Sequence, residues 1–136
     1  MRRLAALVLA AAALSGCGAA SADLFAVERS GRDRNANVRL VVNDGGTVTC
    51  NRGRPRELGG DRLLTARELA RELEPQAKLD LELPREPDAI LSYTVRLAAG
   101  RVMFSDTSPR LPASFQRLEA FAADVAENVC RLKRYG

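Results

Sequence analysis

The chain has 136 residues, of which 46% are apolar, enough for one domain with a hydrophobic core but too few for two. It contains 21 Lys and Arg against 17 Asp and Glu, and this net charge of +4 is too balanced to predict a nucleic-acid partner. The absence of His excludes a Ser-His-Asp triad, a His-based zinc site and an imidazole base, and the sequence contains no glycine-rich phosphate loop.

The first 16 residues have the pattern of a bacterial signal peptide. Arg2 and Arg3 give a positive start, and residues 4–14 form an apolar run of 11 residues. That run is too short to span a bilayer, which takes about 20 residues. We therefore assign residues 1–16 to a signal for ordinary secretory export, in preference to twin-arginine export or a buried N-terminal helix.

The signal ends in the letters LSGC at positions 14–17, which resemble the lipobox of bacterial lipoproteins. In that class a diacylglyceryl group is attached to the Cys thiol, and the chain is cut just before it, here between Gly16 and Cys17. The resemblance implies acyl chains such as palmitate on Cys17 and a place on the outer face of the cytoplasmic membrane. The alternative is soluble secretion after cleavage near Ala20 or Ala22.

Residues 17–22 then form a short tether, and residues 23–136 are predicted to be a single domain. Five residues after Cys17 reach at most about 17 Å, so the domain would lie close to the bilayer. Two acyl chains suffice for stable anchoring, because each buried CH₂ contributes about 0.8 kcal/mol.

Lipid on Cys17 leaves Cys50 and Cys130 as the two other cysteines of the chain. Exported proteins fold in an oxidising compartment, so we predict a Cys50–Cys130 disulfide in preference to two free thiols. A catalytic thiol is disfavoured, because the chain has no His to activate one.

Three strands are expected in the first half of the domain, at residues 23–29, 36–43 and 47–50. Val42 and Val48 should share one face of the sheet, and that register places Cys50 opposite Leu40, facing the core. Residues 44–46 then form a three-residue loop with Gly in the left-handed conformation.

The rest of the domain predicts two helices and further strands. Asp61 is a candidate N-cap for a helix that ends before Pro75, and residues 113–133 form the longest helix, with Cys130 near its last turn. Strands are expected at residues 89–97 and 101–105, with a short edge strand at 79–83. The order β-β-β-α-β-β-α predicts an α+β domain: an antiparallel sheet of four to six strands with two helices on one face.

Two charged clusters are candidate binding surfaces. Arg52, Arg54 and Arg56 lie in a loop predicted at residues 51–60, and they could contact lipid phosphates or an anionic envelope polymer. The acidic residues of segment 80–88 could in principle form a sugar-cleaving carboxylate pair or a calcium site. An ordinary solvated surface is the favoured interpretation of both clusters, and we predict no metal, no cofactor and no catalytic residue.

The stretches DLFAVERSG, LVVNDGGTVTCN and ILSYTVR, together with the final helix ending in VC, resemble a family of small actinobacterial lipoproteins. That resemblance implies a compartment and a fold but no mechanism. The leading hypothesis is therefore a membrane-anchored, non-catalytic domain that binds an envelope protein or polymer. The alternative is a secreted protease inhibitor, because the chain also resembles subtilisin-inhibitor-like proteins. Those proteins have two disulfides, one of which braces the reactive loop, and only one cysteine pair is available here.

Overall fold

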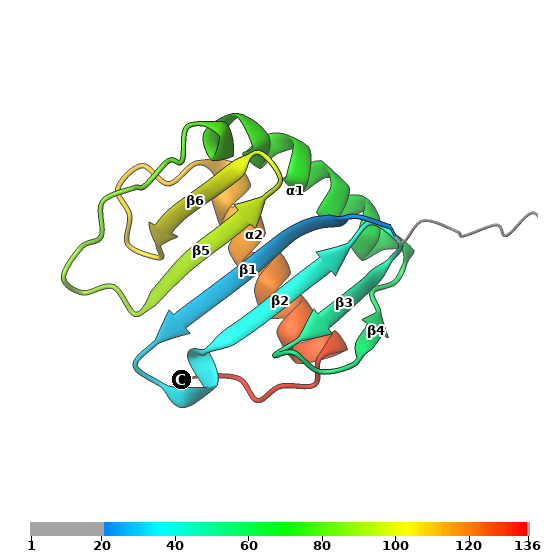
Figure 1. Cartoon of the computed structure of the whole chain (residues 1–136). Coiled ribbons are helices and arrows are strands. Elements are labelled where there is room, and N and C mark those ends of the chain that lie inside the picture. The colour runs from blue at the N-terminus through cyan, green and yellow to red at the C-terminus, as the bar shows by residue number, and fades with distance from the viewer. Residues whose placement is uncertain (1–20, 136) are drawn as a thin grey trace, which may run out of the picture.

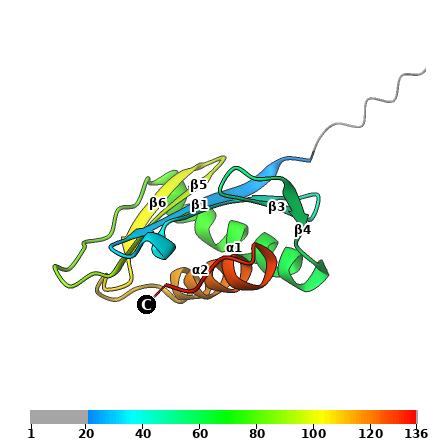
Figure 2. The same cartoon turned by 90° about the horizontal axis from the view of Figure 1, so that it is seen from below.

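The computed structural model describes residues 21–135 and contains one six-stranded antiparallel sheet in the order β4-β3-β2-β1-β5-β6 (Figure 1). The strands are β1 (Asp23–Gly31), β2 (Val38–Asn43), β3 (Thr47–Cys50), β4 (Pro55–Glu57), β5 (Leu91–Leu97) and β6 (Gly100–Ser105). The helices α1 (Gly60–Lys78) and α2 (Ala113–Asp124) both lie on one face of this sheet (Figure 2). The predicted α+β class is confirmed.

The core fills the space between the sheet and the two helices. Alternate strand residues face this layer because side chains of a strand point to opposite faces in turn. Phe25 of β1 meets Phe121 of α2 edge to face, with ring centroids 5.9 Å apart. Phe104 of β6 lies between Tyr93 and Phe115, at centroid distances of 4.9 and 4.8 Å. These aromatic contacts join three strands to α2 across the core.

The predicted register of the first hairpin is confirmed. Val42 pairs with Val48, and Leu40 pairs with Cys50. The loop between β2 and β3 spans the predicted residues 44–46, and Gly46 has a φ of 93°, which a residue with a side chain rarely adopts. The sheet face of every residue in β2 and β3 follows from this pairing.

Helix α1 is longer than predicted, and both predicted ends are wrong. The N-cap is Gly59 in place of Asp61, and the helix runs through Pro75 to Lys78. A proline inside a helix removes one hydrogen bond, yet here the last turn buries Ala77 completely against the core. The packing of that turn explains why the helix continues past the proline.

The predicted helix over residues 113–133 is also wrong at its C-terminal end. α2 ends at Asp124, and the chain continues as a π-helical turn, η2 (Val125–Val129), before it leaves the helical path. The Cys130 N–H donates to the carbonyl of Val125 at 2.9 Å, and Arg131 then has a φ of 59°. The disulfide fixes Cys130 beside β3, so the tail at residues 131–135 turns toward the end of the sheet (Figure 1).

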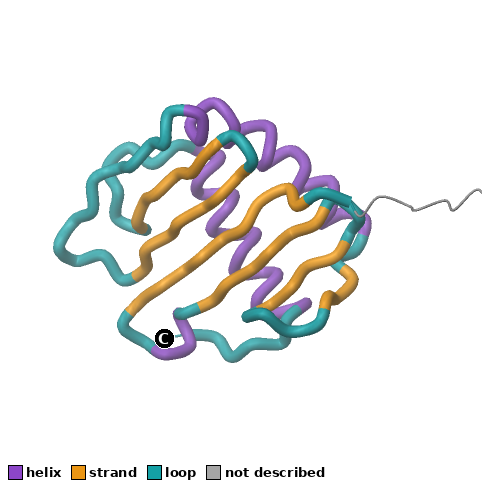
Figure 3. Tube along the Cα trace, viewed as in Figure 1, coloured by secondary structure: helices purple, strands orange, loops and turns teal. Residues whose placement is uncertain are grey.

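Two further segments differ from the prediction. The loop predicted at 51–60 contains the short edge strand β4, which pairs with β3. The edge strand predicted at 79–83 is reduced to one parallel bridge between Glu82 and Met103 of β6. The segment between α1 and β5 otherwise runs as a loop past the β6 edge (Figure 3). A 3-10 turn, η1 (Arg34–Ala36), precedes β2 at the start of the strand predicted over 36–43.

Candidate functional site

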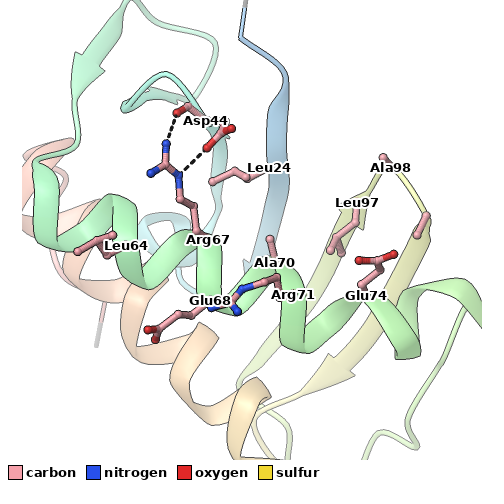
Figure 4. A pocket seen from close by; sticks show the side chains of 11 residues that line it. Leu24, Asp44, Leu64, Arg67, Glu68, Ala70, Arg71, Glu74, Leu97 and Ala98 are labelled. Carbon is pink, nitrogen blue, oxygen red and sulfur yellow. Dashed lines mark hydrogen bonds and ion pairs between the residues drawn. The ribbon is translucent and has the colours of Figure 1, made fainter.

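An open groove of about 610 Å³ lies between α1 and one end of the sheet (Figure 4). Its apolar lining comes from the start of β1, from α1 and from the hairpin between β5 and β6. These residues are Leu24, Leu64, Ala70, Leu97, Ala98 and Ala99. Leu64 is 60% exposed, so this groove presents a large apolar side chain to solvent. We call it the α1 groove.

Charged side chains surround the α1 groove, and most of them are paired. Arg67 donates from Nε to the carboxylate of Asp44 at 2.7 Å (Figure 4), and Glu68 accepts from Arg117 of α2 at 3.1 Å. Glu74 pairs with Lys78 at 2.9 Å. Arg71 forms no ion pair with any residue between 21 and 135. The groove therefore combines an apolar floor with one uncompensated positive charge.

Leu24 lines the α1 groove from an irregular position at the start of β1. The pairing of β1 with β2 shifts register between Asp23 and Phe25, so Leu24 lies in an irregularity at the start of the strand. Its side chain points toward α1 in Figure 4. Leu24 belongs to the start of β1, so the α1 groove lies at the N-terminal end of the described chain.

A second surface feature is the exposed loop at residues 84–90. At its first end the carbonyl of Pro84 accepts a hydrogen bond from the Ser108 hydroxyl at 2.7 Å. At its other end the N–H of Ile90 donates to the Asp106 carboxylate at 3.2 Å. Within this loop only Ala89 is buried, and Ile90 is 62% exposed. The loop is therefore held at both ends while its middle faces solvent.

The three arginines predicted as an anionic contact differ in their surroundings. Arg52 and Arg54 are exposed in the turn between β3 and β4. Arg56 lies in β4 opposite Val48, and its guanidinium donates to the carbonyl of Val129 at 3.4 Å. One of the three is therefore engaged with η2 at the edge of the helical layer.

The remaining predicted residues fall into two groups. Gly16 and Cys17 lie outside the described residues, as do the signal at 1–16 and most of the tether. Cys50 and Cys130 are joined by the predicted disulfide, with Cα atoms 5.9 Å apart.

Across residues 21–135 we find no group of three metal-binding side chains, and no helix in that part of the chain is long and apolar enough to cross a bilayer.

Sequence reasoning did not find the α1 groove. Leu64 lies outside the apolar stripe of α1. A large apolar residue on the exposed side of a helix is the sequence feature that could have indicated a binding surface there. Leu97 continues the alternation of the buried residues Tyr93 and Val95 in β5, but it is only partly buried and lines the groove. Arg71 gave no signal, because a sequence does not show which charged residues of a helix will form ion pairs.

Searches against protein-family models, curated proteins and solved structures found no match to this chain.

Proposed function

We propose that the protein is a lipoprotein anchored to the outer face of the cytoplasmic membrane, whose domain binds an envelope protein and catalyses no reaction. The observation that carries this proposal is the open, apolar α1 groove, which Leu24 lines at the start of β1, seven positions after Cys17 in the sequence. The lipobox at 14–17 supports the anchor, and the Cys50–Cys130 disulfide is consistent with an oxidising compartment. The lack of His supports a binding role over the commonest kinds of hydrolysis.

The chemistry of the groove defines the partner. Leu24, Leu64 and Leu97 offer apolar contact area, and Arg71 offers a guanidinium that has no carboxylate partner in the described part of the chain. A protein segment that carries apolar side chains and one Asp or Glu would satisfy both features, because an ion pair formed at a desolvated groove is stronger than one on an open surface. Acidic, apolar segments are therefore the proposed ligands.

The anchor also limits where such a partner can lie. Leu24 comes seven positions after Cys17 in the sequence, and an extended chain of that length reaches at most about 24 Å. A groove held within that distance of the bilayer meets membrane-proximal segments of other envelope proteins. Partners that stay far from the membrane are not expected to reach it.

The anchor is tested with Cys17→Ala in cells. We expect the variant to remain uncut or to be released, whereas the unaltered protein should fractionate with membranes. The control is Cys50→Ser, which changes a cysteine but leaves the lipobox intact and should still be anchored. Full membrane retention of a processed Cys17→Ala protein would contradict the anchor.

The groove is tested by placing a photo-crosslinking amino acid at Leu64 in cells. Leu79 is the matched control, because it is also a large exposed side chain, 79% exposed, and does not line the groove. We expect an adduct at position 64 but not at 79, on a partner segment with apolar side chains and a carboxylate. Arg71→Glu should weaken that adduct, whereas Arg96→Glu on the open sheet face should not. Equal yields at 64 and 79, or no effect of Arg71→Glu, would refute the groove as the binding site.

A separate assay tests the absence of catalysis. If the purified protein turned over an envelope substrate, and one carboxylate substitution abolished that turnover, the non-catalytic part of the proposal would be wrong.

A second candidate function is protease inhibition, and the loop at 84–90 favours it. Proteases bind chains in extended form through main-chain hydrogen bonds, and a loop already held in place loses less entropy on binding. Ser108 and Asp106 brace this loop, where the inhibitors that the chain resembles use a disulfide. Arg85 is exposed in the loop and is the candidate specificity residue for a trypsin-like protease.

Inhibition is tested by mixing the purified protein with trypsin-like and subtilisin-like proteases at micromolar concentration. We expect Arg85→Ala to abolish any inhibition of the trypsin-like enzyme, whereas Arg110→Ala, another exposed arginine outside this loop, should leave it unchanged. If neither protease is slowed, this candidate function is eliminated.

A further inference from the structure

A polar pocket of about 310 Å³ is lined by η1 and the C-terminal tail. Both segments lie at the end of the sheet opposite to the start of β1 (Figure 1). The walls of the pocket come from the 3-10 turn η1, the start of β2, the residue after β3 and the tail after η2. The buried side chain of Val38 and the partly buried side chain of Leu132 form its apolar part. We call it the tail pocket.

The disulfide assembles this pocket from two distant parts of the chain. Asn51 directly follows Cys50, and Arg131 directly follows Cys130. Both residues have a positive φ, 48° for Asn51 and 59° for Arg131, so the chain turns sharply after each cysteine. The bridge and these two turns together place both side chains in the same pocket wall.

Two asparagines of the tail pocket have their carbonyl oxygens already engaged. Asn37 Oδ1 accepts the N–H of Gly31 at 3.1 Å, and Asn51 Oδ1 accepts the N–H of Arg39 at 2.8 Å. The oxygen of each amide is thereby identified, and each NH₂ group remains as a donor. Neither NH₂ group has a hydrogen-bond partner within the described chain. The amides therefore add hydrogen-bond donors to the pocket, and their acceptor oxygens are already used.

The charges of the pocket are all positive. Arg34, Arg131 and Lys133 line it, and none of them forms an ion pair with a residue in the 21–135 range. No carboxylate is among the lining residues. The neighbouring acid is Asp33, which caps η1 by accepting the N–H of Asn35 at 2.8 Å. Three like charges around one cavity repel each other, and a bound anion would relieve that repulsion.

We propose that the tail pocket binds the phosphate group of a free phosphate, a small phosphate ester or a lipid headgroup. A tetrahedral oxyanion offers several acceptor oxygens at once, and guanidinium, ammonium and amide groups are donors that match them. The apolar wall of Val38 and Leu132 leaves room for a carbon substituent on the phosphate. This inference depends on neither the lipid anchor nor the α1 groove.

The test is a titration of the purified, disulfide-bonded protein with inorganic phosphate, followed by amide chemical shifts in NMR. We expect saturable shifts at Asn35, Asn37, Asn51 and the tail, and no such shifts with chloride at equal ionic strength. Glycerol phosphate should shift the same residues. Vesicles that contain phosphatidylglycerol, compared with vesicles that lack anionic lipid, show whether a lipid headgroup is also a source of the phosphate.

Asn51→Asp is the sharpest variant, because Asp keeps the oxygen that accepts the N–H of Arg39 and replaces only the free NH₂ donor with a negative oxygen. We expect it to weaken phosphate binding by about tenfold or more with the fold retained. The double change Arg131→Gln and Lys133→Gln should have a similar effect, whereas Arg96→Gln on the open sheet face should have none.

The possible results separate clearly. Saturable, pocket-dependent binding of inorganic phosphate supports a small phosphate ligand, and pocket-dependent binding to anionic vesicles alone supports a lipid headgroup. The proposal is overturned if neither probe binds, if chloride gives the same shifts, or if Asn51→Asp binds phosphate as well as the unaltered protein does.

Discussion

Cys50 and Cys130 are joined across 80 positions of sequence and connect the end of β3 to the end of η2, the turn that continues α2. Removal of either cysteine should release the C-terminal tail and destabilise the fold. The chain-entropy estimate for a loop of this length is about 4.5 kcal/mol, and strain in the native state lowers it. We expect Cys50→Ser and Cys130→Ser to lower the free energy of unfolding in urea by similar amounts.

The double variant provides the check on that prediction. Because one bond is lost in all three proteins, Cys50→Ser combined with Cys130→Ser should be no less stable than either single variant. Additive losses would mean that the two side chains stabilise the fold through separate packing contacts and that the bridge itself contributes little.

The sheet could be predicted well because its signals are local. Val42 and Val48 must share one face, and that requirement together with a three-residue loop at 44–46 fixes the register of Leu40 with Cys50. Helix ends were less predictable, because packing decides them: α1 continues past Pro75 to bury Ala77, and α2 gives way to η2 beside the disulfide. Local propensity contains no information on either contact.

The candidate sites were the least predictable part. The tail pocket depends on the chain turning at Arg131, which the helical pattern through residue 133 conceals. The α1 groove is lined by Leu24, at the irregularity of β1, and by Arg71, which has no ion-pair partner among residues 21–135 although its neighbours are paired. Such features arise from tertiary contacts between elements that are far apart in the sequence, and a single sequence does not reveal those contacts.

Glycine at position 100 is required by the contact between the β5–β6 hairpin and α1. Gly100 has a φ of 150°, and a Cβ there would overlap the carbonyl oxygen of Ala77. Gly100→Ala must therefore push the end of α1 away from the hairpin, and we expect a loss of about 2–4 kcal/mol in the free energy of unfolding. The midpoint of urea denaturation, compared with that of the unaltered protein, measures this loss.

Gly60→Ala is the matched control for that substitution. A Cβ at position 60 meets no atom within 4 Å, and the residue lies in the first turn of α1. The free energy of unfolding of the Gly60→Ala variant should stay the same or rise by up to about 1 kcal/mol. If both alanine variants behaved alike, the close approach of Ala77 to the hairpin would not be the reason for glycine at 100.

Glu119 should make stability depend on pH near neutrality. Burial of this carboxyl, assisted by the charge of Asp106, raises its pKa to about 7 from an ordinary 4.5, and its buried Oε1 has no hydrogen-bond partner among the described residues. A folded-state pKa above the unfolded one means that the folded protein holds the proton more tightly. The contribution of Glu119 to the free energy of unfolding is therefore largest below pH 4.5, and it falls as the pH rises from 4.5 to 7.

Glu119→Gln should remove that dependence. At pH 8 we expect the variant to be more stable than the unaltered protein by at most about 3 kcal/mol, with a smaller gain to the extent that water reaches the carboxyl. Glu82→Gln, which removes an exposed carboxylate, controls for the loss of one negative charge. Thermal unfolding between pH 4 and 8 measures the effect, and parallel curves for Glu119→Gln and the unaltered protein would rule it out.

Pro75 is the residue at which α1 departs most from helical preference, and its replacement should stabilise the protein. Proline at position 75 offers no N–H to the carbonyl of Arg71, and its ring crowds that carbonyl. Pro75→Ala restores the donor, and we expect an increase of about 1–3 kcal/mol in the free energy of unfolding. The control is Glu74→Ala, which loses only an exposed ion pair with Lys78 and should change stability by less than about 0.5 kcal/mol. A midpoint of urea denaturation that is unchanged or lower in Pro75→Ala would mean that proline's restriction of the unfolded chain outweighs the hydrogen bond it removes.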